Sequence, residues 1–128
     1  MLGAILGDIV GSVYENHPIK TKVFPFFSAD CRFTDDTVLT VAVARALLSG
    51  QSYTDAMREF GNRYPDAGYG RSFARWLKQS DTVSYGSYGN GSAMRVSPVA
   101  FAFDDLDRAL EEARFSAVST HSHPEGIK

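Results

Sequence analysis

The sequence has little cysteine and no long apolar run, and each of these absences excludes a class of protein. Cys31 is the only cysteine in 128 residues, so no disulfide bond can form within the chain. This fits a reducing compartment, and we expect a cytoplasmic protein. Thr40 and Arg45 interrupt the longest apolar stretch, residues 38–48, which is too short and too polar to cross a membrane. We therefore expect no membrane partner.

The sequence also lacks an excess of charge of either sign. The 13 Lys and Arg residues are scattered along the chain and are offset by 15 Asp and Glu residues. Without a basic patch, nucleic-acid binding has no electrostatic support. The apolar start of the chain, residues 1–13, lacks a basic segment and contains Asp8. We interpret it as a core helix rather than a signal peptide.

Strand signals are almost absent, because apolar and polar residues hardly alternate. Apolar residues recur at helical spacing, which predicts an all-α fold, a compact helical bundle. Pro98 should kink one of the helices or mark its start. Pro124, Glu125 and Gly126 resemble the first turn of a further helix, which we expect to be cut after Lys128. The predicted helices cover residues 2–13, 35–48, 54–64, 72–79, 93–103 and 104–120. Thr34 is the predicted N-cap of the second of these helices, and Gly50 is its predicted stop. The predicted long loops are residues 17–33 and 80–92.

Thr34-Asp35-Asp36-Thr37 is the first candidate site. Hydroxyl and carboxylate oxygens suit a hard cation such as magnesium or calcium. The two adjacent acids point in different directions, so each could serve a different ion. A threonine N-cap followed by aspartates also favours a helix N-terminus without any metal. These four residues alone leave both interpretations open.

Asp8 and Glu15 lie on nearly the same face of the first predicted helix. Asp8 falls within an apolar segment, where a buried carboxylate needs a partner. Glu15 falls at the helix end, where the dipole disfavours a negative charge. Both placements hint at function. The alternative is that Asp8 caps a neighbouring helix and Glu15 is solvated.

Residues 85–92 form a glycine-rich loop before a predicted helix. Glycines let a backbone approach a ligand closely, and N–H groups at a helix start can bind phosphate. Tyr88 could stack on a base or a ribose. No Lys-Ser or Lys-Thr pair follows the glycines and no strand precedes them, so neither a P-loop nor a dinucleotide-binding βαβ unit is predicted. An ordinary flexible loop is the alternative.

His121 and His123 alternate near the end of the chain. Zinc sites need three or four ligands at suitable spacing, and the sequence does not supply them. A polar cap on the neighbouring helix, or a hydrogen bond from His121 to a ligand, is the favoured interpretation.

Taken together, these segments resemble the ADP-ribosylglycohydrolase family, which includes the dinitrogenase reductase-activating glycohydrolases. The motifs follow the family's order along all 128 residues. They are Gly3-Ala4-Ile5-Leu6-Gly7-Asp8 with Glu15, Thr34-Asp35-Asp36-Thr37, Gly68-Tyr69-Gly70, Gly86-Ser87-Tyr88-Gly89-Asn90-Gly91-Ser92-Ala93-Met94-Arg95, and Thr120-His121.

The resemblance implies an all-α fold around two magnesium ions, for which manganese could substitute. It also implies hydrolysis of the glycosidic bond between ADP-ribose and an acceptor side chain or small molecule. By resemblance, Thr34, Asp35 and Asp36 are metal ligands, and Asp35 and Asp36 are also catalytic. Glu15 resembles an acidic residue beside the metals, as a ligand or as a general acid/base. The implied ADP-ribose contacts are Gly68, Tyr69, Gly70, Ser87, Tyr88, Gly89, Asn90, Gly91 and His121.

The family takes its remaining metal ligands from a C-terminal Asp-x-Asp-Ser/Thr motif on a considerably longer chain. No such motif follows Thr34 here, since Asp105-Leu106-Asp107 is followed by Arg108. We therefore expect residues 1–128 to be the N-terminal part of a single domain, C-terminally truncated and with half of the metal site. Its exposed apolar surfaces should favour self-association or pairing with a missing C-terminal half. The alternatives to a hydrolase are a non-catalytic module that binds ADP-ribose or a related nucleotide, and a structural, crystallin-like remnant.

Overall fold

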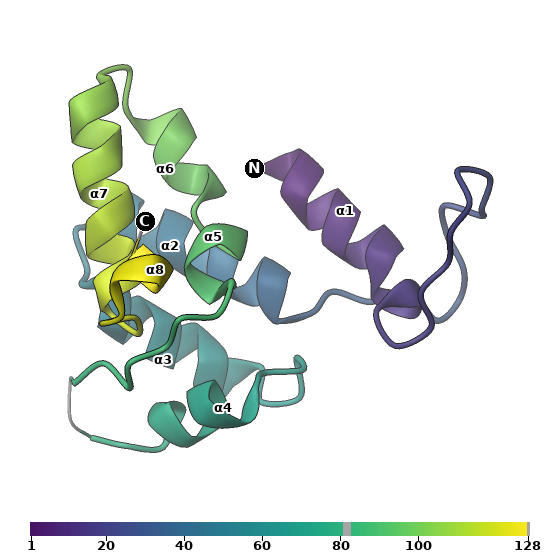
Figure 1. Cartoon of the computed structure of the whole chain (residues 1–128), viewed down its shortest axis with the longest axis horizontal. Helices are drawn as coiled ribbons and strands as arrows, with labels where there is room; N and C mark the ends of the chain where they lie inside the picture. Colours follow the sequence, from purple (N-terminus) through teal and green to yellow (C-terminus); the bar gives the residue numbers. More distant parts are fainter. Residues whose placement is uncertain (81–82, 128) are drawn as a thin grey trace.

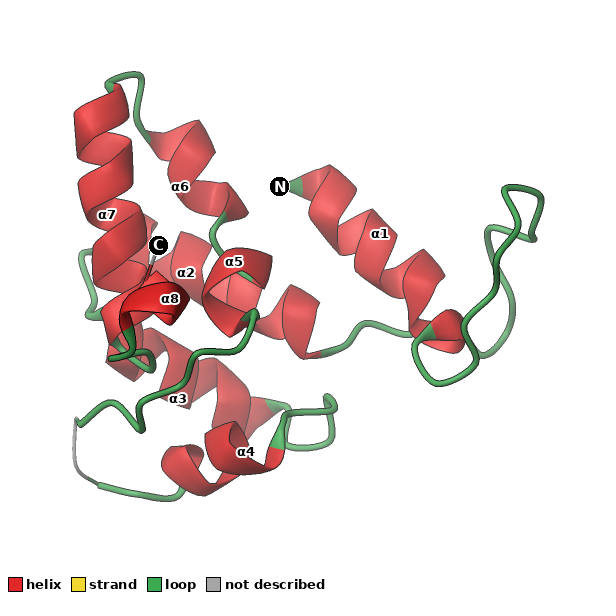
Figure 2. Ribbon diagram, viewed as in Figure 1, coloured by secondary structure: helices red, strands yellow, loops and turns green. Residues whose placement is uncertain are grey.

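The computed structural model describes residues 1–80 and 83–127, and every regular element in these ranges is helical (Figure 2). The prediction of an all-α fold is confirmed. None of the described helices is long and apolar enough to cross a membrane. The elements are α1 (Leu2–Gly11), the 3-10 helix η1 (Ser12–Tyr14), α2 (Asp35–Ser49), α3 (Tyr53–Arg63), α4 (Arg71–Leu77), α5 (Gly91–Met94), α6 (Ser97–Ala102), α7 (Leu106–Val118) and α8 (Pro124–Ile127).

Helix α2 is the central element, and α1, α3, α5 and α6 all contact it (Figure 1). Its start and its end are both set by single residues. The side chain of Thr34 accepts a hydrogen bond from the backbone N–H of Asp36, and Gly50 ends the helix in the left-handed conformation, with φ of 71°. The predicted N-cap and the predicted stop are confirmed.

The hydrophobic core lies where α2, α3 and α4 meet. Trp76 is fully buried there, and its indole N–H donates a hydrogen bond to the carbonyl oxygen of Val83 at 3.1 Å. This bond ties α4 to the segment that leads into the glycine-rich loop. The core cluster consists of Leu39, Ala42 and Ala46 from α2, Ala56 and Met57 from α3, and Phe73, Trp76 and Leu77 from α4.

The prediction that the first helix belongs to the core is wrong. Val10 is the only buried residue of α1, whereas Leu2 is 79% exposed and Leu6 is 51% exposed. Helix α1 leans away from the main body and meets it at the start of α2 (Figure 1). Helical periodicity shows that a helix has an apolar face, but it does not show what covers that face.

The predicted helix over residues 93–103 is two helices. Helix α5 ends at Met94 and α6 begins at Ser97, with Pro98 in its first turn. Proline is favoured there because the first N–H groups of a helix have no partner within it. The alternative that Pro98 marks a helix start is therefore confirmed. Burial is also uneven, since Val99 is 2% exposed and Phe101 is 76% exposed.

The C-terminal helices follow the prediction closely. The side chain of Asp105 caps α7 by accepting a hydrogen bond from the backbone N–H of Arg108, and Pro124 begins α8. The predicted loop 17–33 is confirmed. The predicted loop 80–92 is confirmed for residues 80 and 83–90, whereas residues 91–92 already belong to α5 and residues 81–82 lie outside the described residues.

The position of Trp76 gives a first testable prediction. Trp76→Ala should lower the free energy of unfolding by about 3–5 kcal/mol, because it leaves a large cavity among three helices. The matched control is Phe101→Ala, which removes an exposed aromatic ring and should change it by less than about 0.5 kcal/mol. Urea unfolding followed by far-UV circular dichroism measures both. Equal effects would contradict the placement of the core.

Candidate functional site

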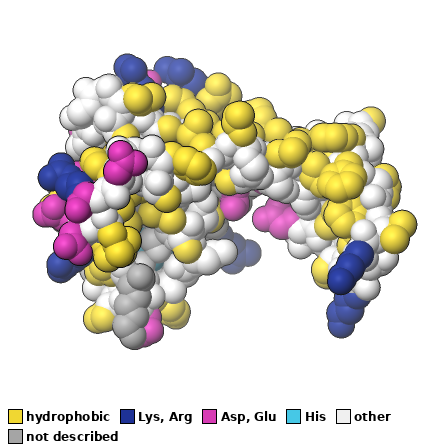
Figure 3. Space-filling model, turned by 90° about the horizontal axis from the view of Figure 1, so that it is seen from above, with side chains coloured by type: hydrophobic (Ala, Val, Ile, Leu, Met, Phe, Trp, Pro, Cys, Tyr) yellow, Lys and Arg dark blue, Asp and Glu magenta, His cyan; other side chains and the backbone are white. Residues whose placement is uncertain are grey.

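Two cavities open at the N-terminus of α2. The larger, about 510 Å³, is lined by residues of α2, α4 and the loop before α5, and the smaller, about 260 Å³, is lined by residues of α1, η1 and the start of α2. Asp35 lines the larger cavity and Asp36 lines the smaller one. The two adjacent carboxylates therefore face different cavities. Seen from above, acidic side chains lie in the notch between the main body and the part of the molecule around residues 12–33 (Figure 3).

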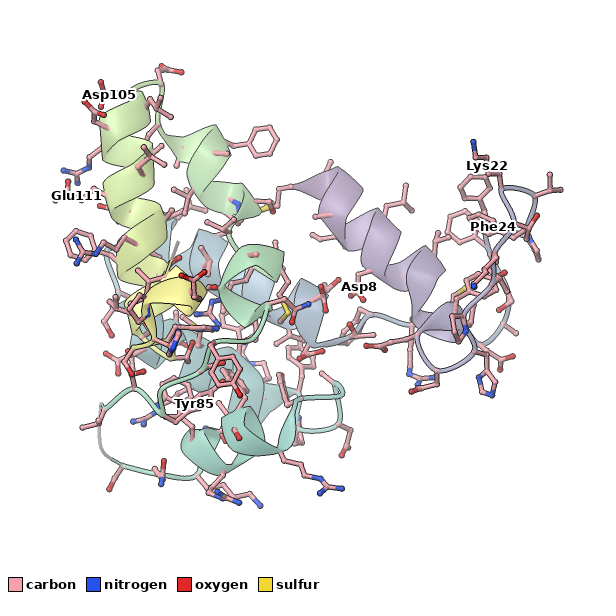
Figure 4. All side chains as sticks on the ribbon, in the orientation of Figure 1. Asp8, Lys22, Phe24, Tyr85, Asp105 and Glu111 are labelled. Atoms are coloured by element: carbon pink, nitrogen blue, oxygen red, sulfur yellow. The ribbon has the colours of Figure 1, made fainter. Side chains whose placement is uncertain are left out.

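Asp8 fixes α1 to the start of α2 (Figure 4). Its Oδ2 accepts hydrogen bonds from the backbone N–H of Thr34 at 2.8 Å, from the backbone N–H of Thr37 at 3.1 Å and from the Thr37 hydroxyl. Its Oδ1 accepts a hydrogen bond from the hydroxyl of Thr34. The interpretation of Asp8 as a cap on a neighbouring helix is confirmed.

This arrangement also orients Thr34. Its hydroxyl hydrogen is donated to Asp8, and its oxygen accepts the N–H of Asp36 at 3.4 Å. A hydroxyl oxygen has two lone pairs, so one is left for a further ligand. The capping role and the predicted metal role of Thr34 are thus compatible.

Carboxylates crowd the acidic side of the site. Burial, followed by repulsion from Asp36 and then from Glu15 and Asp8, raises the pKa of Asp35 to about 6. Burial and then the charges of Asp8 and Glu15 raise the pKa of Asp36. A bound cation would relieve this repulsion, and the oxygens of Asp36, Glu15 and Thr34 are of the kind that magnesium prefers.

The acids do not make a complete metal site by themselves. In residues 1–80 and 83–127, no three His, Cys, Asp or Glu side chains come together closely enough to hold a metal ion. The chemistry of the donors fits magnesium, while their number and placement fit part of a site. The predicted magnesium or manganese ions and their ligands stay predictions.

The larger cavity brings together most of the predicted ADP-ribose contacts with Asp35. Gly86 starts the loop with φ of 73°, a conformation that glycine adopts without strain. The backbone N–H groups of Asn90 and Gly91 donate no hydrogen bond within the described residues. Arg71 lies exposed in the lining and adds positive charge. The predicted contacts in the lining are Gly70, Ser87, Tyr88, Gly89, Asn90 and Gly91.

Gly68 and Tyr69 lie beside this cavity rather than in its lining. A Cβ atom built on Gly68 would lie 3.9 Å from Oδ1 of Asp35. The ring of Tyr69 packs on Phe73, with centroids 5.2 Å apart, and its hydroxyl has no hydrogen-bond partner among the described residues. Burial and then the charge of Asp35 raise the pKa of Tyr69 to about 12.

His121 lies behind the glycine-rich loop. The residue is 1% exposed, and both ring nitrogens are occupied, Nδ1 with the Thr120 hydroxyl at 2.8 Å and Nε2 with the carbonyl oxygen of Gly89 at 3.1 Å. In this arrangement its predicted contact with a ligand is indirect, through the loop.

Sequence reasoning placed Arg95 at the end of the glycine-rich motif but assigned it no role. The residue is 1% exposed, lines the larger cavity and donates hydrogen bonds through Nη2 to the carbonyl oxygen of Ser116 at 3.0 Å and to the Thr120 hydroxyl at 2.8 Å. Burial lowers the pKa of Arg95 to about 10, so it stays charged at neutral pH. The signal was present in the sequence, because Arg95 is the only charged residue in the otherwise apolar stretch 93–103.

Comparison with known proteins identifies the family of the chain. The family model of the ADP-ribosylglycohydrolases matches residues 1–128. The ADP-ribosylhydrolase ARH3 of Xenopus tropicalis is 30% identical to this chain, and the match covers 95% of this chain. The ARH3 proteins of Mus musculus and Homo sapiens are 31% and 29% identical, again over 95% of the chain. The chain spans 43%, 42% and 43% of the length of these three relatives.

The Asp8 contacts generate a second prediction. Asp8→Asn replaces one of two accepting oxygens by an NH₂ group that faces donors, and it removes the charge. The free energy of unfolding should fall by about 2 kcal/mol, the value of hydrogen bonds to a charged group. Asp104→Asn, at an exposed position, is the control and should change it by less than about 0.5 kcal/mol. An equal loss in both variants would contradict the role of Asp8.

The raised pKa of Asp35 generates a third prediction. Between about pH 4 and pH 6 the folded state holds a proton on Asp35 that the unfolded state releases. The free energy of unfolding should therefore fall as the pH rises through this window. Asp35→Asn removes this contribution, so the variant should gain stability relative to the parent chain as the pH rises. Urea unfolding at intervals from pH 4 to pH 8 measures this difference, and a constant difference would contradict the assignment.

Proposed function

Because this chain belongs to the ADP-ribosylglycohydrolase family, we propose that it serves hydrolysis of the glycosidic bond between ADP-ribose and an acceptor, a protein side chain or a small molecule. One observation carries the proposal: Asp35 lines a cavity with a glycine-rich loop, and the adjacent Asp36 lines a second cavity with other acids. The first cavity suits a nucleoside diphosphate and the second suits a divalent cation. The scissile bond is then placed near the start of α2, beside these two carboxylates.

The larger cavity is the proposed binding site for ADP-ribose. Its volume, about 510 Å³, lies within the range of small-molecule sites. The N–H groups of Asn90 and Gly91, which donate no hydrogen bond within the described part of the chain, and the charged Arg71 supply donors for the diphosphate. Tyr88 is 75% exposed in the lining and offers a ring for stacking on the base or the ribose. Ser87 and Gly89 complete the loop, Gly70 lies in the lining with Asp35, and Gly68 and Tyr69 lie beside the cavity.

Thr34, Asp35, Asp36 and Glu15 are the proposed magnesium ligands of this chain, with manganese as the alternative ion. Magnesium, when bound, supplies the Lewis acidity that activates water near neutral pH. Glu15 lies in the acidic cavity, where it takes a proton from the attacking water and returns one to the leaving acceptor. Asp8 holds Thr34 in the orientation that this arrangement needs. The remaining ligands come from outside these 128 residues.

We also propose that the apolar face of α1 and α6 is a contact surface with the polypeptide that completes the site. Leu2, Leu6 and Phe101 are all more than half exposed on these helices. Hydrophobic side chains spread across the face of the molecule seen from above (Figure 3). Exposed apolar surface of this kind favours association with another protein segment or with a second copy of the chain.

A non-catalytic module that binds ADP-ribose is the second candidate. It is favoured by the larger cavity, whose lining, the glycine-rich loop included, lies entirely within the described residues. This candidate predicts binding of ADP-ribose without release of product from an ADP-ribosylated substrate.

Calorimetric titration with ADP-ribose tests both candidates. In magnesium buffer the chain should bind, and Tyr88→Ala should bind about tenfold more weakly because a stacking contact is lost. Phe101→Ala is the control, since it removes an exposed ring that lines neither cavity, and its affinity should equal that of the parent chain. Replacement of magnesium by chelator should weaken binding in the parent chain but not in Asp35→Asn.

Each part of the proposal has its own contradicting result. No binding in either buffer would contradict the ADP-ribose site. Binding that is equally strong with chelator would contradict the metal ligands. Binding without release of ADP-ribose from a modified peptide would select the binding module for the isolated chain.

A further inference from the structure

We propose that Arg95, Thr120 and His121 form a one-way hydrogen-bond relay that holds the glycine-rich loop from behind and aims the backbone N–H of Asn90 away from the protein interior. These three are positioning residues, and the relay fixes His121 as the neutral tautomer with its proton on Nε2. The relay is a feature of the fold. Its effect on ligand binding rests on the proposed function.

The direction of the relay follows from its two ends. The guanidinium of Arg95 can only donate, so Thr120 Oγ1 must accept from Nη2 at 2.8 Å. At the other end, the carbonyl oxygen of Gly89 can only accept, so Nε2 of His121 must donate to it across 3.1 Å. A neutral imidazole that donates from Nε2 accepts at Nδ1. The Thr120 hydroxyl therefore donates its hydrogen to Nδ1 at 2.8 Å. This fixes the position of every proton in the relay.

Burial strengthens this relay. Arg95 and His121 are each 1% exposed, and Thr120 is fully buried. Hydrogen bonds in a poorly polarisable interior are stronger than in water, and an unsatisfied group there is costly. Burial, together with the charge of Arg95, lowers the pKa of His121, which agrees with a neutral ring.

The relay acts on the peptide that joins Gly89 to Asn90. In a trans peptide the C=O and the N–H point in opposite directions. Since the Gly89 carbonyl is held toward the buried ring of His121, the Asn90 N–H points away from it. That N–H has no partner among the described residues, and Asn90 lines the larger cavity. The relay thus presents a donor to the space where an anionic ligand would bind.

Helix α8 clamps the same loop from another side. The Ser92 hydroxyl donates to the carbonyl oxygen of Gly126 at 2.7 Å. A Cβ atom at Gly126 would lie 2.8 Å from the Ser87 carbonyl oxygen and 2.7 Å from Cδ2 of His121, closer than side chains can approach. Only glycine allows this contact. The backbone N–H of Ser87 in turn donates to the Thr120 carbonyl at 3.1 Å, so both the side chain and the backbone of Thr120 support the loop.

The first test needs no variant. In the whole chain with ¹⁵N-labelled histidine, a long-range proton–nitrogen correlation spectrum at neutral pH reports which ring nitrogen carries the proton. We expect His121 to show a protonated Nε2 and an unprotonated Nδ1. A proton on Nδ1, or on both nitrogens, would overturn the relay.

The second test compares Thr120→Val with Thr120→Ser. Valine keeps the size and loses the hydroxyl, so the His121 tautomer should become mixed, the Asn90 amide resonance should shift, and the affinity for ADP-ribose should fall about tenfold. Serine keeps the hydroxyl and should restore the tautomer, with an affinity within about twofold of the parent chain. A folded Thr120→Val with an unchanged tautomer and an unchanged Asn90 amide would overturn the proposal.

Two further readouts keep the test decisive. If Thr120→Val does not fold, Gly126→Ala displaces both the Ser87 carbonyl and the ring of His121, and it should shift the Asn90 amide together with the ring resonances of His121. An unshifted amide in that variant would contradict the clamp. If the parent chain shows the expected tautomer but binds no ADP-ribose, the proposed function fails while the relay stands.

Discussion

Asp8 holds α1 on the first turn of α2 with four hydrogen bonds, and the geometry of the candidate site follows from that contact. Val10 is the only buried residue of α1, so apolar packing contributes little to its docking. A carboxylate that accepts from two backbone N–H groups and two hydroxyls replaces that packing. The same charge lies at the N-terminus of α2, where the helix dipole favours it. One polar contact therefore sets the position of a whole helix.

The position of α1 determines which cavity each acidic side chain at the start of α2 faces. With Thr34 turned toward Asp8, Asp35 and Asp36 line different cavities, and Glu15 joins the acidic one. The cost is electrostatic, since burial and neighbouring charges raise the pKa of Asp35 to about 6. A fold that only needed a helix cap would gain by removing these charges. Their presence despite that cost is the kind of local conflict that marks a functional site.

The sequence predicted those parts of the structure that local physical chemistry determines. The cap at Thr34, the stop at Gly50 and the helix start at Pro98 each depend on one residue and its neighbours, and all three are confirmed. The exposure of α1 could not be predicted, because an apolar stripe such as Leu2 and Leu6 looks the same whether or not another segment covers it. The relay behind the loop joins residues 89, 95, 120 and 121, and periodicity carries no information on contacts between such distant positions. The predicted roles of individual side chains in binding and catalysis stay predictions.

The lining of the larger cavity contains both a carboxylate and a guanidinium, and this combination bears on which ligand it can hold. Asp35 lies near other carboxylates, which disfavour its charge. Arg95 is buried with only neutral acceptors, the Ser116 carbonyl and the Thr120 hydroxyl, and no acidic partner among the described residues. A buried cation without a counter-ion favours negative charge beside it, whereas a crowd of carboxylates favours a cation. The proposed ligand, an anionic diphosphate accompanied by magnesium, carries charges of both signs and so complements both Asp35 and Arg95. Neither a neutral nucleoside nor a free metal ion does so.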